Sequence, residues 1–168
     1  MNDNFIDETL RKEILKIAND KEQEKLNFGL GLCYVASKYK GDYELNTKYA
    51  KNHCNFVART LKMIPIAPHL IFPAYGFKDE VEHDRKVTRI YGLKLLTLCK
   101  RAIFFIDKND EDMSEGMKAE FDFAMKLPHI EIENILYTLD HNKEIVSYET
   151  NNQITLIKTS KIEVEDVK

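Results

Sequence analysis

The chain has 168 residues, of which 43% are hydrophobic and 32% are charged, and its formal net charge is −3. This composition is typical of a globular domain rather than of a disordered chain. The slightly acidic balance argues against a nucleic-acid polymer as partner, because such proteins usually carry a basic surplus. The longest apolar runs, such as residues 102–106, are too short to cross a membrane, so no membrane partner is expected.

The cysteines and the first residues indicate the compartment. Residues 1–4 lack the basic and apolar stretches of a secretory signal. Cys33, Cys54 and Cys99 form no CxxC pair, and their odd number argues against a disulfide framework. We therefore expect a reduced, cytoplasmic protein.

Hydrophobic periodicity predicts the secondary structure in chain order. A helix is expected over 7–25, because Leu10, Ile14 and Ile17 recur at helical spacing behind a capping Asp7. After it, strands alternate with helices. The expected strands are 30–36, 63–68 and 101–107, the expected helices are 44–62, 80–99 and 114–127, and an aromatic-rich loop covers 69–78. Two weaker strands are expected at 132–137 and 153–157.

This alternation predicts an α/β fold, a doubly wound (flavodoxin/Rossmann-like) parallel sheet flanked by helices. We expect a single domain whose core, 27–137, carries an added N-terminal helix in 1–26 and a C-terminal extension in 138–168. In such sheets, ligands bind beyond the carboxyl ends of the strands. That rule selects the loops 37–43, 67–78 and 107–116 as the places for a binding site.

The helix predicted at 114–127 carries the sharpest local signal. Ser114 can cap the helix, and Gly116 allows a ligand to approach the first turn, where free N–H groups attract anions. At 100° per residue, Glu120 lies at the margin of the apolar stripe, beside Met117 and Ala124. A carboxylate directed inward has its pKa raised by desolvation, which suits nucleophilic or acid–base chemistry. The alternative is a Glu120 that turns to solvent or pairs with a lysine.

The two other loops allow two interpretations each. Residues 37–43 contain hydroxyls, lysines and a glycine that suit a phosphate or a sugar, or else form an ordinary polar turn. In 68–73, aromatic groups can stack on a base or form a hydrophobic lid, and His69 can contact substrate or be structural. No metal or other cofactor is expected, because the five histidines form no helical i,i+4 pair and no zinc-type cluster with the cysteines.

Three stretches, 34–42, 65–73 and 114–120, together resemble the nucleoside 2-deoxyribosyltransferase-like superfamily, in particular an uncharacterised bacterial and phage branch of it. With the helix around 92–96 between them, the resemblance covers about residues 31–127. Members act on the N-glycosidic bond of nucleosides or nucleoside monophosphates, and their catalytic glutamate comes four residues after a glycine that starts a helix. Here that pair is Gly116 and Glu120.

The resemblance implies that Glu120 attacks the anomeric carbon and passes the sugar to water, as a hydrolase, or to a second base, as a transferase. It also implies the substrate-binding positions. Ser37 and Ser114 would hold a 5′-phosphate, Tyr39, Gly41 and Asp42 would line the sugar end, and His69 and Phe72 would line the base end.

One departure concerns charge. Lys38 and Lys40 stand where the branch commonly has proline and arginine, which keeps the positive charge and loses the bidentate arginine fork.

Two functions from different classes follow. The first is an N-glycosidic-bond hydrolase or transferase acting on a nucleoside or nucleoside 5′-monophosphate. The second is a protein that binds a nucleotide or nucleotide-derived signal on the same fold without turnover. The apolar face of the N-terminal helix can pack on its own sheet or across a dimer, and relatives are commonly oligomers, so we expect a homodimer or larger homo-oligomer.

Overall fold

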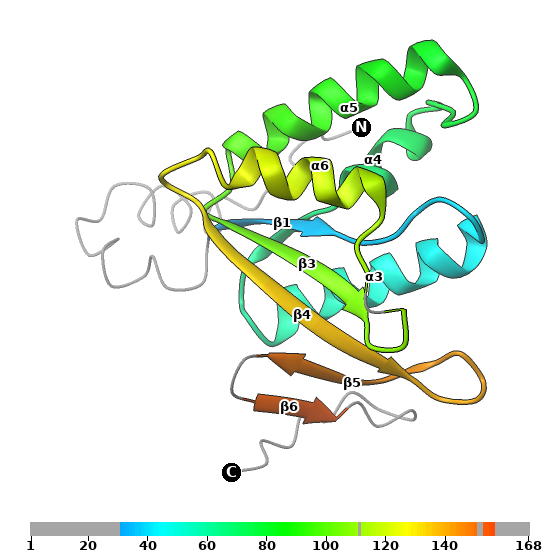
Figure 1. Cartoon of the computed structure of the whole chain (residues 1–168), viewed down its shortest axis with the longest axis vertical. Helices are drawn as coiled ribbons and strands as arrows, with labels where there is room; N and C mark the ends of the chain where they lie inside the picture. Colours follow the sequence, from blue (N-terminus) through cyan, green and yellow to red (C-terminus); the bar gives the residue numbers. More distant parts are fainter. Residues whose placement is uncertain (1–30, 111, 151–152, 157–168) are drawn as a thin grey trace, which may run out of the picture. The chain divides into compact units, whose positions relative to one another are not determined.

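The computed structural model describes residues 31–110, 112–150 and 153–156 (Figure 1). They belong to one compact unit that begins at Gly31. The helix predicted over 7–25 lies outside the described residues. The described elements are, in chain order, β1 (Leu32–Ala36), α3 (Tyr43–Arg59), β2 (Ile64–Ile66), α4 (Pro68–Ala74), α5 (Glu82–Thr97), β3 (Arg101–Asp107), α6 (Glu115–Ala124), β4 (Glu131–Leu139), β5 (Ile145–Thr150) and β6 (Gln153–Leu156).

Within these ranges the strands form one six-stranded sheet in the order β2-β1-β3-β4-β5-β6. The pairs among β2, β1, β3 and β4 are parallel, and β5 and β6 each run antiparallel to their neighbours. The predicted α/β class, a doubly wound sheet of flavodoxin-like order, is confirmed. The weaker strands predicted at 132–137 and 153–157 correspond to β4 and β6. The region predicted as a C-terminal extension therefore continues the sheet.

Helices cover both faces of the sheet, with α3 on one face and α5 and α6 on the other (Figure 1). Because successive strand side chains point to opposite faces, β1 contributes to two cores. Cys33 and Val35 pack in the α3 core, and Tyr34 packs in the core under α5 and α6. The central strands therefore carry apolar side chains on both faces, as buried parallel strands do.

Residues 68–74 form the short helix α4, where a loop over 69–78 is predicted. Pro68 occupies the first turn of α4, where its fixed φ favours a helix and its missing N–H removes no bond. Pro73 lies near the carboxyl end, so it breaks little of the helix, and Gly76 follows at a φ of +87°. The loop prediction was wrong for 69–74, because it rested on Pro68, Pro73 and Gly76, which are typical of loops but here lie at the ends of a short helix.

Strand β5 was not predicted, and a tight turn creates it. The Asp140 carboxylate accepts hydrogen bonds from the backbone N–H groups of Asn142 and Glu144, each at 2.9 Å. Lys143 takes a φ of +60° in this turn. A turn this short can only join antiparallel strands, so β5 pairs back onto β4.

His53 of α3 is a fully buried polar group within the α3 core. Its ring stacks on Phe105 with 4.2 Å between the ring centroids, and its Nδ1 lies 2.9 Å from the hydroxyl of Tyr148. Its Nε2 is a buried nitrogen without a hydrogen-bond partner in the described part of the chain. Burial, and to a lesser degree His69, lowers the pKa of His53 well below its usual value, so the ring is neutral.

We expect this histidine to make folding sensitive to acid. Below about pH 6.5, His53 binds a proton in the unfolded chain but stays neutral in the folded protein. Acidification therefore favours unfolding. His53→Phe should be less stable than wild type at pH 7, because Tyr148 loses its partner. That deficit should shrink at pH 5, because acid destabilises the wild type through His53 and has no such effect on the variant.

Urea unfolding of both proteins at the two pH values isolates this effect, since they share every other titrating group. His141→Phe, at an exposed position, is the control. A His53→Phe deficit that is the same at pH 5 and pH 7 would contradict the prediction.

Candidate active site

The strand order reverses at β1. The chain leaves β1 for β2, which lies on one side of β1, and then passes to β3, which lies on the other side. The loops after β1 and β3 therefore diverge, and ligands of open α/β sheets bind at such a switch point. The first of these loops begins at Ser37, and the second ends at Ser114, which precedes α6.

Glu120 lies on α6 and is turned toward β1. The hydroxyl of Tyr34, which is 0% exposed, donates a hydrogen bond of 2.9 Å to Glu120 Oε1. Burial raises the pKa of Glu120 to about 7, and the Tyr34 hydrogen bond and the charge of Arg89 oppose that rise. The carboxylate is thus held in one orientation and changes its charge near neutral pH.

Tyr34 is well suited to be a donor that stays protonated. Burial and the neighbouring Glu120 charge raise the pKa of Tyr34 well above its usual value. Gly92 of α5 lies next to this hydroxyl, since a Cβ at that position would be in ordinary contact with the Tyr34 oxygen, at 3.4 Å, and with Pro68, at 3.7 Å.

The site prediction missed Tyr34, although the sequence held a signal for it. A tyrosine within a short buried strand needs a partner for its hydroxyl, since an unpaired buried polar group is costly. Tyr34 lies two residues before Ala36 in this strand, so both side chains point to the same face of the sheet.

Ser37 and His69 form a second polar pair at this edge. Ser37 is 7% exposed, and its Oγ lies 3.1 Å from His69 Nε2. Burial lowers the pKa of His69 to about 4, so the imidazole is neutral at neutral pH and offers one donor and one acceptor. The ring of Tyr39 packs against His69, with 5.7 Å between the centroids, and against Tyr43 at 5.0 Å. Ser37, Tyr39 and His69 are thus brought together.

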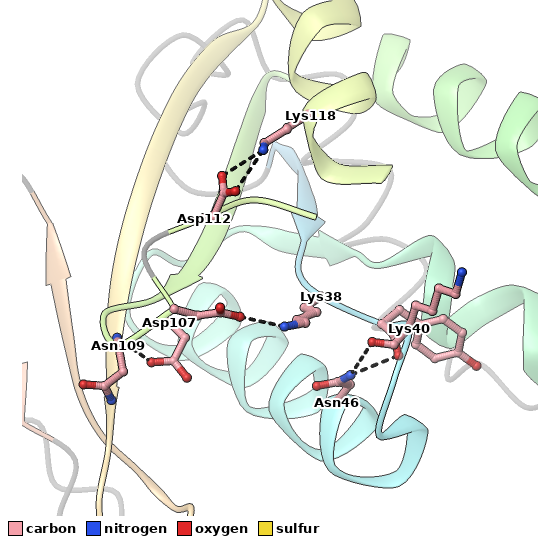
Figure 2. Close-up of polar contacts among 9 residues, drawn as sticks. Lys38, Lys40, Asn46, Asp107, Asn109, Asp112 and Lys118 are labelled. Atoms are coloured by element: carbon pink, nitrogen blue, oxygen red, sulfur yellow. Dashed lines mark hydrogen bonds and ion pairs between the residues drawn. The ribbon is translucent and has the colours of Figure 1, made fainter. Parts of the chain in front are cut away.

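The other residues of the loop between β1 and α3 fix the conformation of its backbone. Asn46 Nδ2 donates to the carbonyl oxygens of Tyr39, at 3.0 Å, and Lys40, at 3.2 Å (Figure 2). Gly41 has a φ of +110°, a conformation that favours glycine. Asp42 caps α3 by accepting from the N–H of Leu45 at 3.1 Å. The Asp42 carboxylate therefore serves as the N-terminal cap of α3.

Ser114 and Gly116 lie at the start of α6. Ser114 Oγ caps the helix by accepting from the N–H of Met117 at 3.3 Å. Among the described residues, a Cβ at Gly116 would meet only Ser114 Oγ, at 3.9 Å, so the described atoms leave space beside the first turn.

Phe72 does not join this group. It is 9% exposed and packs with Phe77 and Tyr91, at centroid distances of 6.0 and 6.1 Å, between α4 and α5. Burial in that contact keeps its ring from the edge of the sheet, whereas Tyr39 presents an aromatic ring there.

Two ion pairs tie the loop after β3 to its surroundings (Figure 2). Lys38 Nζ lies 2.6 Å from Asp110 Oδ2, which joins the loops that follow β1 and β3. Lys118 Nζ of α6 lies 2.9 Å from Asp112 Oδ1. Sequence analysis found neither pair, because the partners are distant in the chain or lie in an irregular loop.

Two further findings concern the described residues alone. They contain no group of three or more His, Cys, Asp and Glu side chains that could hold a metal ion. None of their helices is both long and apolar enough to span a membrane.

Topology and site together define an α/β protein with a half-buried glutamate beside the switch point of its sheet. The chain belongs to the family described as domain of unknown function DUF7768, whose model matches residues 31–135. No curated protein matches it.

Two solved structures are similar to the chain. One is a 2-deoxyribosyltransferase from the psychrotolerant bacterium Bacillus psychrosaccharolyticus, with 19% identity, 64% of this chain and 72% of that chain covered, and a TM-score of 0.41. The other is a 2-desoxiribosyltransferase from Leishmania mexicana, with 12% identity, 81% and 79% covered, and a TM-score of 0.45.

The contact between Tyr34 and Glu120 predicts how the carboxylate titrates. Tyr34→Phe removes a hydrogen bond that favours the ionised form, so the pKa of Glu120 should rise above 7 by about 1. Carbon-13 NMR of labelled glutamate carboxyls measures this directly. Tyr43→Phe, which removes an exposed hydroxyl bound to Asp79, is the control and should leave Glu120 unchanged. An unchanged Glu120 titration in Tyr34→Phe would show that the hydrogen bond has no such role.

Proposed function

We propose that this protein cleaves the N-glycosidic bond of a nucleoside or a nucleoside 5′-monophosphate, with Glu120 as the nucleophile. The observation that carries the proposal is the half-buried Glu120, whose carboxylate is oriented by the Tyr34 hydroxyl at 2.9 Å. The motif resemblance supports the same residue, because Glu120 stands four positions after Gly116 at the start of a helix. A carboxylate can act as a nucleophile in glycosyl transfer through a covalent intermediate.

The reaction would proceed in two displacements. The Glu120 carboxylate attacks C1′ of the sugar and forms a glycosyl ester, while the electron pair of the C1′–N bond leaves with the base, which takes a proton from solvent. Water then attacks C1′, loses a proton, and releases the sugar together with the restored carboxylate. In a transferase, a ring nitrogen of a second base replaces water and loses its proton.

The other groups of the edge would bind the substrate. Neutral His69 and Ser37 can hydrogen-bond to hydroxyl or base groups, since each can donate and accept. The ring of Tyr39 offers a surface on which a base can stack. Tyr34 would act as a positioning residue that fixes the Glu120 carboxylate toward C1′.

The alternative from the sequence, nucleotide binding without turnover, would be favoured by a Glu120 held in an ion pair. The hydrogen bond from Tyr34 supports the enzyme instead. Assembly into a homo-oligomer and a cytoplasmic location stay predictions from the sequence.

Loss of the nucleophile should abolish cleavage. We expect wild-type protein to release free base from at least one member of a panel of nucleosides and 5′-monophosphates, followed by chromatography. Glu120→Gln and Glu120→Ala should lower kcat at least about 1000-fold, because they remove the group that forms the covalent intermediate. Asp122→Asn, on the exposed side of the same helix, is the matched control.

Mass spectrometry of acid-quenched wild-type protein should detect a glycosyl adduct on Glu120. If no panel member is cleaved while one still binds, the enzyme proposal is wrong and the binding protein replaces it.

The rate of cleavage should follow the ionisation of Glu120. Only the carboxylate form attacks, so kcat/KM should rise between pH 6 and pH 8 with a midpoint near 7, the pKa of Glu120. The rise should have the slope of one titrating group. In Tyr34→Phe the midpoint should move to higher pH. A profile that is flat over this range, or that falls with rising pH, would rule out Glu120 as the ionised nucleophile.

A further inference from the structure

The loops at the carboxyl ends of β1 and β3, together with the start of α6, contain groups that commonly attract phosphate. Two lysines of this region are paired with aspartates. Lys38 is bound by Asp110 at 2.6 Å and Lys118 by Asp112 at 2.9 Å, with both aspartates in the loop between β3 and α6 (Figure 2). Each pair sums to zero charge. The lysines therefore provide little net attraction for an anion that approaches from solvent.

The serine hydroxyls of this edge already have partners, and a carboxylate lies at the start of α6. The first turn of α6 carries the carboxylate of Glu115, which lies at the positive end of the helix dipole. Ser114 Oγ accepts from the N–H of Met117, and Ser37 Oγ is paired with His69. A phosphate at this edge would meet carboxylates and hydroxyls that already have partners.

Two further cations are near the site, and neither offsets this arrangement. Lys40 extends away from the Lys38–Asp110 pair (Figure 2). Arg89 lies on α5 and acts electrostatically on the Glu120 carboxylate, where it helps to lower the pKa that burial raises. Its charge is therefore opposed by that of Glu120.

We infer that the site takes a nucleoside with a free 5′-hydroxyl rather than its 5′-monophosphate, and that Asp110 sets this preference by neutralising Lys38. The inference rests on the proposed function and chooses between the two substrate classes it leaves open. A dianionic phosphate would have to displace Asp110 from Lys38 and would then face Asp112 and Glu115, and like charges brought together are costly. A hydroxyl group carries no charge and can donate a hydrogen bond to a carboxylate.

The test compares one nucleoside with its own 5′-monophosphate in wild type and in Asp110→Asn. The Lys38 and Asp110 side chains are 50% and 51% exposed, so their pair contributes little to folding and the variant is expected to fold normally. Wild type should prefer the nucleoside by at least about 10-fold in kcat/KM. Asp110→Asn should raise the ratio of kcat/KM for the monophosphate to kcat/KM for the nucleoside about 10-fold.

Two further variants make the comparison specific. Glu131→Gln breaks the ion pair with Arg101, 2.8 Å long, at the amino ends of β3 and β4, and changes the net charge by the same amount. It should leave the substrate preference unchanged. The double variant Lys38→Ala with Asp110→Asn should lose the gain, because the gain comes from the released lysine.

The outcomes separate the inference from the proposed function. A wild type that prefers the monophosphate, or an Asp110→Asn that behaves as Glu131→Gln does, overturns the inference and leaves glycosidic cleavage standing. Absence of cleavage from both compounds and from every other member of the panel overturns the proposed function. In that case calorimetric binding of the same two compounds to wild type and Asp110→Asn decides the inference, which then requires tighter binding of the nucleoside and a gain in monophosphate binding.

Discussion

Strand β1 has a parallel neighbour on each side, and the site follows from that constraint. Its backbone pairs with β2 from Leu32 and with β3 up to Ala36, so its carboxyl end lies in the interior of the sheet and not at its rim. Helices must cover both faces of such a strand, which sets α3 against one face and α5 and α6 against the other. The loop after β1 and the helix after β3 consequently meet at one edge. Glu120 reaches the side chain of Tyr34 because both belong to the same layer.

The pKa of Glu120 is set by one effect that raises it and two that lower it. Burial disfavours its charge, and the Tyr34 hydroxyl and Arg89 favour it, with burial the largest of the three. Stronger opposition would leave a fully ionised carboxylate of low basicity, and weaker opposition would leave a carboxylic acid. The observed balance gives a group that is available in both forms near neutral pH, which suits a nucleophile that must also serve as a leaving group.

Periodicity predicted the long elements because each places many apolar residues on one side, and β3 was predicted at its observed bounds, Arg101–Asp107. It failed for α4, whose prolines and following glycine are locally typical of a loop and whose stability comes from Phe72 packing on α5. The inward direction of Glu120 follows from the spacing within its own helix. Its partner Tyr34 is 86 positions away in the chain, and Lys38 is 72 positions from Asp110, so no local pattern contains either contact.

Tyr34 belongs to the hydrophobic core under α5 and α6 and also holds the Glu120 carboxylate. The packing of this core therefore determines how the Tyr34 hydroxyl is presented to the Glu120 carboxylate. A substitution at Leu96 or Ala124 that shifts a helix by a few tenths of an ångström would alter the angle of the Tyr34 hydroxyl and, with it, the reactivity of the carboxylate. Efforts to improve the thermal stability of this domain by redesigning that layer would therefore also change the surroundings of the Glu120 carboxylate, whereas Tyr34 is not a member of the core under α3.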